Sequence, residues 1–193
     1  MADTSSQQPT VYDYATGTQW RLVFNRLPKT TWFCTAANVP GITLGEAQYA
    51  TPMTDMIVTG DKLTFETLNI TFIVDEELQN YREIWDWIVG MGSPVNHSQW
   101  ETVLGKGDGA IRKFGTEDAD PRTKTTYEES NLYSDSTLIV YNSKNKAKVN
   151  VQFKNMFPTS LSALEYSQEL TDVEYFKASA TFRYLYYEFE TVT

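Results

Sequence analysis

The amino-acid sequence predicts a mainly β protein, an antiparallel β-sandwich or barrel with one flanking α-helix at about residues 75–91 and a long polar loop insertion. Apolar side chains alternate along several short runs that end at turn signals, which is the pattern of half-buried strands. Only one segment has helical spacing. Aromatic residues, which pack well on a pleated surface, make up 14% of the chain. A length of 193 residues suits a single domain with a sizeable core.

The segment before the helix predicts strands separated by turns. Strands are expected at residues 20–25, 31–37, 42–50 and 53–58, the last closed by Thr59-Gly60-Asp61. Leu63 and Phe65 then share one parity, whereas the apolar residues of 68–74 share the other. Because a change of parity moves side chains to the opposite face of a sheet, a bulge or tight bend is expected near Glu66-Thr67.

One segment predicts an amphipathic helix that packs against a sheet. Asp75 is the expected N-cap, and Glu76 and Glu77 would complement the positive end of the helix dipole. The apolar stripe consists of Leu78, Tyr81, Ile84, Trp85 and Ile88. The residues expected to end the helix are Gly90, Gly92 and Pro94.

The chain beyond the helix predicts a long loop and then more strands. Residues 93–134 are polar and lack periodic apolar positions, so they are expected to form an extended loop insertion. Further strands are expected at residues 136–141, 149–153, 161–166 and 173–189. Asn142–Lys146 reads as a turn that makes the first two a hairpin. The last strand is apolar on both faces, which favours cover by a second layer or by a neighbouring subunit.

The residues that most often carry chemistry are isolated in this sequence. His97 is the only histidine and Cys34 the only cysteine, so the usual ligand sets for a metal are missing. His97 is interpreted as a solvated loop residue. Cys34 lies in an apolar run and is interpreted as a small buried hydrophobic residue, since an exposed nucleophile would need a nearby histidine.

Three further motifs have weaker functional interpretations. Gly105–Gly109 resembles a phosphate cradle, but it lacks the Walker spacing and reads as a loop tip. Asp75, Glu76 and Glu77 could form a carboxylate cluster for acid–base work or cation binding, yet helix capping explains all three. Glu117–Asp120 reads as a solvated loop. The sequence therefore predicts no catalytic, cofactor-binding or metal-ligating residues, and no enzyme.

Charge and hydropathy exclude other classes of protein. A net charge of −9 disfavours stable binding to nucleic acid, which requires clustered Lys and Arg. No stretch has the ~20 apolar residues that cross a membrane, and the N-terminus does not resemble a signal peptide. Residues 1–17 are expected to form a flexible N-terminal arm until a partner orders them. We expect the protein to be made in a reducing cytoplasm.

An ordered set of segments resembles the tail tube proteins of contractile-tailed, T4-like bacteriophages, whose relatives include tube-initiating proteins of the baseplate. The strand-into-helix run Asn69–Ile88 is the longest of these segments. The others are Asn25–Pro28, Asn38–Gly41, Gly60-Asp61, Phe157–Leu164 and Asp172–Tyr184. Together they cover most of residues 19–189 in the order of the family. The insertion at 93–134 is longer than a minimal tube subunit requires.

The resemblance implies a β-sandwich with a flanking helix that closes, as six subunits, into a ring around a channel. Rings would stack into a tube within a virion, with tail sheath, baseplate and tail-terminator proteins as partners. Viral DNA would pass through only transiently, and an acidic lumen would repel its phosphates. We hypothesise that part of Met53–Leu68 faces the lumen or the ring interface, and that residues 93–134 reach an adjacent ring or the baseplate.

Two alternatives remain open. The chain could be a single adaptor, initiator or terminator ring of the same fold instead of the repeating tube subunit. It could also be a ligand-binding β-sandwich in which exposed aromatic residues such as Trp100 or Tyr127 form the platform.

Overall fold

The computed structural model describes residues 14–92, 132–167 and 175–192. Two helices lie in these ranges, α1 (Pro28–Phe33) and α2 (Gln79–Gly92). The strands are β1 (Trp20–Phe24), β2 (Cys34–Ala37), β3 (Ile42–Ala50), β4 (Asp55–Phe65), β5 (Leu68–Ile73), β6 (Ser134–Tyr141), β7 (Ala147–Leu161), β8 (Lys177–Arg183) and β9 (Tyr186–Thr191). The mainly β architecture predicted from the sequence is confirmed, since antiparallel strands make up most of these elements.

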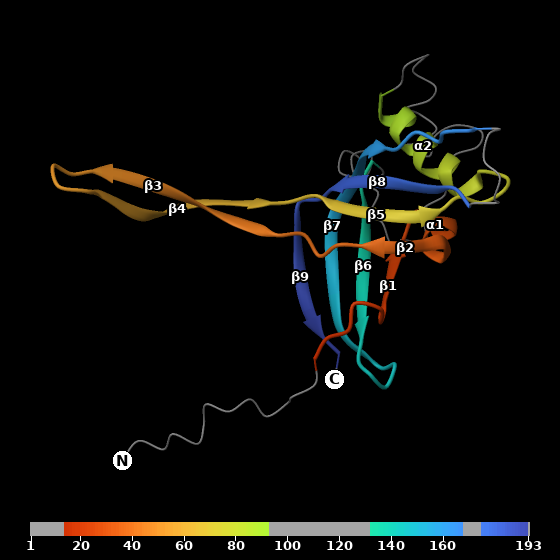
Figure 1. The fold of residues 1–193 in the computed structure, drawn as a ribbon, viewed down its shortest axis with the longest axis horizontal. Coiled ribbons are helices and arrows are strands. Elements are labelled where there is room, and N and C mark those ends of the chain that lie inside the picture. The colour runs from red at the N-terminus through yellow and green to blue at the C-terminus, as the bar shows by residue number, and fades with distance from the viewer. Residues whose placement is uncertain (1–13, 93–131, 168–174, 193) are drawn as a thin grey trace, which may run out of the picture.

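Seven of the strands form one continuous sheet that folds over on itself into two layers. Its order is β1-β6-β7-β8-β5-β2, and β9 pairs with β7 outside that path. Figure 1 shows β9, β7, β6 and β1 running side by side in one layer, while β8, β5 and β2 run across them in the other. The two remaining strands, β3 and β4, pair only with each other and project from this body as a long hairpin.

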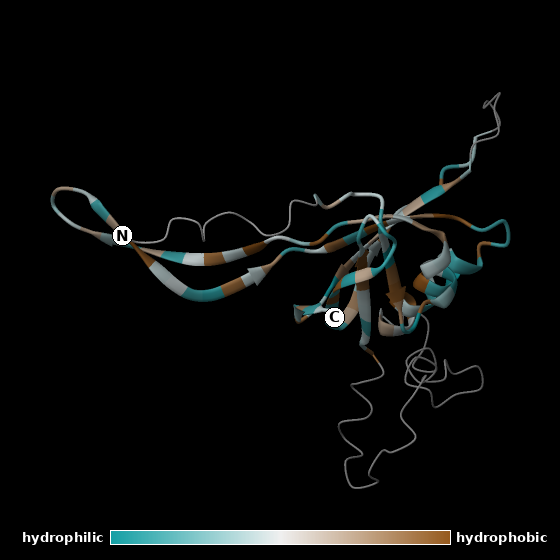
Figure 2. Cartoon of the chain, turned by 90° about the horizontal axis from the view of Figure 1, so that it is seen from below, coloured by the Kyte–Doolittle hydropathy of each residue, from teal (hydrophilic) through white to brown (hydrophobic). Residues whose placement is uncertain are grey.

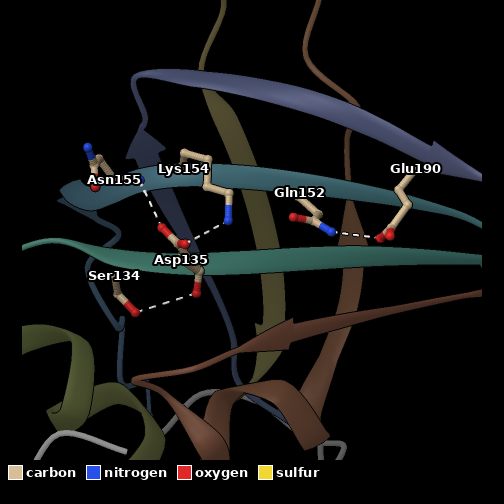
Figure 3. Close-up of polar contacts among 6 residues, drawn as sticks. All are labelled: Ser134, Asp135, Gln152, Lys154, Asn155 and Glu190. Atoms are coloured by element: carbon tan, nitrogen blue, oxygen red, sulfur yellow. Dashed lines mark hydrogen bonds and ion pairs between the residues drawn. The ribbon is translucent and has the colours of Figure 1, made fainter. Parts of the chain in front are cut away.

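Strand β7 belongs to both layers. Its first part pairs with β6 and β9, and its last part, Phe157–Leu161, pairs with β8. The strand changes partners next to Asn155, which has a positive φ of 53°. Figure 3 shows how Asp135 of β6 fixes this point: its carboxylate accepts a hydrogen bond from the Asn155 amide at 3.0 Å and pairs with the Lys154 ammonium at 3.0 Å. The hydrogen bond that Lys154 donates to Asp135 also raises the pKa of Lys154.

The core fills the space between the two layers and is closed at one end by α2. Phe72, Phe153 and Phe182 are fully buried members of it. From α2, Ile84 and Trp87 are also fully buried, and the Trp87 indole N–H donates to the Leu132 carbonyl oxygen at 3.0 Å. Burial of such side chains contributes about 1.5–3 kcal/mol each, which makes this cluster the main stabilising element of the body.

The predicted helix is real, but its start and its buried face differ from the prediction. It begins at Gln79 instead of residue 75, so Asp75 is not its N-cap, and Glu76 and Glu77 precede its first turn. The reason is the buried Asn80, whose side chain binds the Asp75 and Tyr81 amides and the Ile73 carbonyl. These bonds hold residues 75–78 in a turn, in which Leu78 has a φ of 56°.

On the helix surface, the predicted stripe is partly wrong. Trp85 is 48% exposed, whereas Trp87, which the stripe omitted, is fully buried. Trp87 is buried in place of Trp85 because it packs against Phe182 in the core, with the two ring centroids 6.4 Å apart.

Several predicted strands are also corrected. Residues 31–33 of the strand predicted at 31–37 belong to α1, because Pro28 suits a first helical position and the Thr31 amide donates to the Leu27 carbonyl. The strand predicted at 173–189 is two strands, β8 and β9, separated at Tyr184-Leu185. Strand β7 continues through Pro158 to Leu161, so the short strand predicted at 161–166 does not form.

Other predictions are confirmed. The first strand forms as β1, and the pair β6–β7 is a hairpin around residues 142–146. Near Glu66-Thr67 the chain leaves one sheet at Phe65 and enters the other at Leu68, but no bulge or tight bend forms there. The arm predicted at 1–17 and the loop predicted at 93–134 lie mostly outside the described residues. Within the described ranges, neither helix has the length and apolar character needed to span a membrane.

The change of partner at Asn155 gives the first testable prediction. Replacing Asn155 with Val should lower the free energy of unfolding by about 1–2 kcal/mol, because a β-branched residue is strained at positive φ. Urea denaturation of the two proteins measures the difference. Asn155→Gly is the matched control, since glycine adopts this φ without strain. A Val variant as stable as Asn155→Gly would contradict the assignment.

Candidate assembly interface

The β3–β4 hairpin is the part of the molecule that does not pack into the body. No residue of either strand is buried, although both strands are fully described. The hairpin is attached only at its base. There the Glu66 amide donates to the Gly41 carbonyl at 3.0 Å and closes the hairpin, and the Tyr187 hydroxyl of β9 attaches it to the body by donating to the Pro40 carbonyl at 3.0 Å. Beyond this base the two strands extend away from the rest of the molecule (Figure 1).

An aromatic cluster fixes the direction in which the hairpin leaves. The Phe65 ring lies 6.0 Å from Tyr184 and 5.6 Å from Tyr187, and both tyrosines also pack on Phe153 of β7. The Tyr184 hydroxyl donates to the Glu66 carbonyl at 2.8 Å, and burial is the main cause that raises the pKa of Tyr184 to about 12. The tyrosine therefore stays protonated and remains a donor at neutral pH.

The distal half of the hairpin has one apolar and one polar face. Residues paired across an antiparallel ladder share a face. The pairs Tyr49–Met56 and Ala47–Val58 make the apolar face. The alternate pairs are Glu46–Thr59, Gln48–Ile57 and Ala50–Asp55, which make a mostly polar face. Figure 2 shows apolar and polar residues alternating along both strands.

The proximal half repeats this arrangement with the apolar residues on the opposite face. Its apolar pairs are Ile42–Phe65 and Leu44–Leu63, and Thr43–Thr64 lies between them on the other side. Along β3, Leu44 and Ala47 are three residues apart, so their side chains point to opposite faces of the ribbon. The apolar residues of the two halves therefore lie on opposite faces of the ribbon, which twists between them, so that β3 and β4 cross in Figure 1.

A β-bulge-like shift in register, at which Gly45 lies against Gly60, separates the two halves. The pairs Leu44–Leu63 and Glu46–Thr59 are two residues apart along β3 but four residues apart along β4. At this point Gly60 approaches Gly45 so closely that a Cβ on Gly60 would lie 2.7 Å from the Gly45 carbonyl oxygen. The sequence prediction that Thr59-Gly60-Asp61 closes a strand is therefore wrong, because β4 runs straight through them.

The apolar faces are large and open to solvent. Tyr49 is 68% exposed, Met56 56% and Leu63 55%, and Met53 at the tip is 95% exposed. An isolated soluble protein rarely exposes a continuous apolar surface of this kind, and such surfaces mark sites of protein–protein contact. The hairpin is thus the candidate assembly interface. The hairpin offers exposed apolar surface to a partner, and within its two strands it brings no reactive groups together.

Most of the candidate site residues named from the sequence lie outside the described ranges. These are His97, Trp100, Gly105–Gly109, Glu117–Asp120 and Tyr127. Asp75, Glu76 and Glu77 are described, and Glu77 accepts a hydrogen bond from the Gln79 side chain. Across the described residues, no three His, Cys, Asp or Glu side chains lie close enough to hold a metal ion. Cys34 is half-buried, and burial raises its pKa to about 11, so it is a thiol at neutral pH.

The segment proposed from the sequence for the lumen or ring interface, Met53–Leu68, is divided by the structure. Its first part forms the hairpin tip and β4, whereas Leu68 begins β5 and is fully buried in the core. Sequence reasoning missed the contribution of β3. The signal was available, since the apolar residues of 42–50 change parity between Leu44 and Ala47, just as those of β4 do.

Comparison with known proteins places this fold among tail components. The family model described as phage tail tube protein matches residues 15–190. A search of curated proteins finds no match.

Solved structures share the fold at low sequence identity. One similar chain comes from the PVC sheath/tube terminator of an extracellular contractile injection system in the extended state, with a TM-score of 0.57 and 11% identity over 93% of this chain and 99% of that one. Another belongs to the PVC sheath-tube complex, with a TM-score of 0.55 and 14% identity over 98% and 100% of the two chains. A third, from the tube-terminating cap of the anti-feeding prophage, has a TM-score of 0.52 and 16% identity over the full length of both.

The close approach of Gly60 to Gly45 gives a prediction that is specific to the hairpin. Gly60→Ala should open the β3–β4 ladder, because its Cβ would clash with backbone and a two-stranded ribbon has little stability to lose. Amide hydrogen exchange should speed up in β3 and β4 while the body strands stay protected. The control is Gly17→Ala, because a Cβ there meets no atom within 4 Å. Unchanged exchange in Gly60→Ala would refute the contact.

Proposed function

This chain belongs to the phage tail tube protein family, and we propose that it is a ring-forming subunit of the tube of a contractile-tailed phage or phage-tail-like particle. In this proposal, six copies close into a ring and the rings stack into a channel for delivery of the genome. The role is structural and needs no cofactor. Tail sheath and baseplate or tail-terminator proteins are the proposed partners.

The observation that carries the proposal is the projecting hairpin, which exposes apolar residues in both its proximal and its distal half. A surface of this length is covered only when other chains lie against the ribbon. A contact in which the hairpin of one subunit meets a different surface of the next is heterologous, and repeated contacts of this kind close into a ring when their rotation closes. Each subunit in such a ring makes two contacts, one through its own hairpin and one through the surface that accepts the hairpin of a neighbour.

The edges of the sheet support the same assembly. Among the described strands, β1 pairs only with β6, β2 only with β5 and β9 only with β7, so each has one unpaired edge. Unpaired edges lead to uncontrolled association unless another chain covers them. Closure into a ring provides that cover.

The charge of the hairpin suits a place beside the channel. Between residues 42 and 65 the acidic residues Glu46, Asp55 and Asp61 outnumber the single base, Lys62. Acidic groups that line a channel repel the phosphates of passing DNA over about 10 Å. This agrees with the proposal that part of Met53–Phe65 faces the lumen or a ring interface.

A second candidate within the family is a ring present once in each particle, as an adaptor, initiator or terminator. Quantitative mass spectrometry of purified particles separates the two. A repeating tube subunit should match the sheath protein in copy number, whereas a single ring should be present at a small fraction of it. Contact of residues 93–134 with an adjacent ring or the baseplate also remains a proposal.

Charge placed on one face of the hairpin tests the proposed assembly. Met56→Lys should abolish rings and tubes in negative-stain electron micrographs, because a lysine on the apolar face cannot be buried against a neighbour. Gln48→Lys is the matched control, since it adds the same charge on the opposite, mostly polar face. Its assembly should be close to that of the unmodified protein.

Two results would count against the proposal. The unmodified protein could remain a monomer when concentrated and when seeded with tail or baseplate fragments. Alternatively, both lysine variants could assemble normally, which would show that the hairpin faces are not buried in the assembly.

A further inference from the structure

A hollow lies in the body at the sheet edge formed by β1. It has a volume of about 640 Å³ and lies between β1, the end of α1 and the beginning of β2. Its lining includes Trp20, Arg21, Trp32, Cys34 and Tyr141. Trp20, Trp32 and Tyr141 give the hollow aromatic rings, and Arg21 is the charged residue of its lining.

The two most prominent residues of the hollow are placed to receive a partner. The Trp32 side chain is 76% exposed, and the Arg21 guanidinium lies 5.0 Å from the centroid of its indole ring. This stacking holds a positive charge beside an open aromatic face. A ligand with an apolar side chain next to a carboxylate would match both groups.

Strand β1 adds unpaired backbone groups to this hollow. The Tyr141 amide donates to the Gln19 carbonyl, and the Asn25 amide donates to the Asp135 carbonyl. The odd-numbered residues of β1 therefore hydrogen-bond to β6 through their backbone N–H and C=O groups. The backbone N–H and C=O groups of Trp20 and Leu22 point to the opposite side, away from β6. No described strand lies along that outer edge. An extended or turn segment of another chain can hydrogen-bond there.

The tip of the hairpin has the matching chemistry. Met53 is 95% exposed at the turn between β3 and β4, and the exposed Asp55 begins β4 two residues later. We propose that the hairpin tip of a second copy of this chain docks in the hollow, with Met53 against the aromatic rings and Asp55 facing Arg21. The inference rests on the proposed ring assembly and names the surface that accepts the hairpin.

The topology places the two halves of this contact on opposite sides of the body. The hairpin leaves next to β9, where Tyr187 binds Pro40, and β9 and β1 are the two edges of the layer β9-β7-β6-β1. Figure 1 shows the hairpin projecting from the side of the body opposite to α1 and β1. A subunit can then donate its tip on one side and accept a tip on the other, which is the geometry of a head-to-tail ring.

Both the methionine–aromatic contact and the Asp55–Arg21 charge pair favour this docking. Methionine sulfur makes favourable contacts with aromatic rings, and its unbranched chain fits an irregular hollow. The Asp55–Arg21 pair would be shielded from solvent by Trp32 and Met53. Charge pairs across an interface raise its specificity and reject the wrong register.

A photo-cross-linking amino acid tests the contact directly in the full chain. With benzoylphenylalanine at position 53, irradiated assemblies should give cross-links to peptides that contain residues 17–22 or 31–35. Rings or tubes whose cross-links map elsewhere would overturn the docking site and leave the proposed function intact. If the unmodified protein forms no rings, the proposed function itself is overturned, and this outcome differs from one in which rings form but the cross-links map elsewhere.

A charge exchange provides a second test. Arg21→Glu and Asp55→Lys should each raise the protein concentration needed for assembly about tenfold, as measured by sedimentation. The double variant should bring it back towards that of the unmodified protein. Asp61→Lys is the control, because it makes the same charge change on the hairpin away from the tip.

The thermal midpoints of the four variants identify any that fail to fold. A folded double variant that assembles no better than the singles would overturn the pairing. An Asp61→Lys variant as impaired as Asp55→Lys would also overturn it, because the loss would then follow total charge instead of position.

Discussion

The arrangement of this molecule depends on the point where β7 passes from one layer of the sheet to the other. A strand that belongs to two layers must bend, and the bend leaves backbone groups that the ladder cannot satisfy. The Asp135 carboxylate satisfies one of them, the Asn155 amide, and it also pairs with the Lys154 ammonium. Phe153 and Met156, on either side of the bend, point into the core and are fully buried. One carboxylate thus connects the backbone geometry of β7 to the packing of the core.

The hairpin depends on the same bend. Opposite the bend, the chain between β8 and β9 also turns, and the Leu185 amide donates to the Lys154 carbonyl at 2.9 Å. Tyr184 and Tyr187 from this region pack on Phe153 and on Phe65 at the base of the hairpin. The direction of the hairpin is therefore determined inside the body, at a distance from the surface that it presents to partners.

The sequence predicted the elements whose pattern is local. Strand β1, the β6–β7 hairpin and the break between β4 and β5 at Glu66-Thr67 follow from alternation, turn residues and a change of parity. Residues 31–33 were assigned to a strand because their apolar and β-branched composition outweighed the helical preference that Pro28 gives. The start of α2 was missed because Asp75 is a good cap in isolation. The first residue of the helix depends instead on Asn80, whose side chain hydrogen-bonds to the chain before the turn at the Ile73 carbonyl and the Asp75 amide.

The candidate interface was predicted in part. The segment 53–68 was identified, but the pairing of β4 with β3 and the glycine contact between them depend on register, which the alternation of one strand does not specify. The hollow at β1 was not predicted at all. The turn from β1 into α1 brings Trp32 beside Arg21, and only the pairing of β1 with the distant β6 adds Tyr141 to the lining.

The slender attachment of the hairpin has a consequence for the timing of assembly. A two-stranded ribbon without a core gains little free energy from its own contacts, while ordering its backbone costs roughly 1–2 kcal/mol for each residue. In the proposed assembly, most of the free energy that holds such a ribbon in one shape would come from the surfaces it meets in neighbouring subunits. Free subunits would then associate weakly with one another and add more readily to a growing end, where those surfaces are already in place.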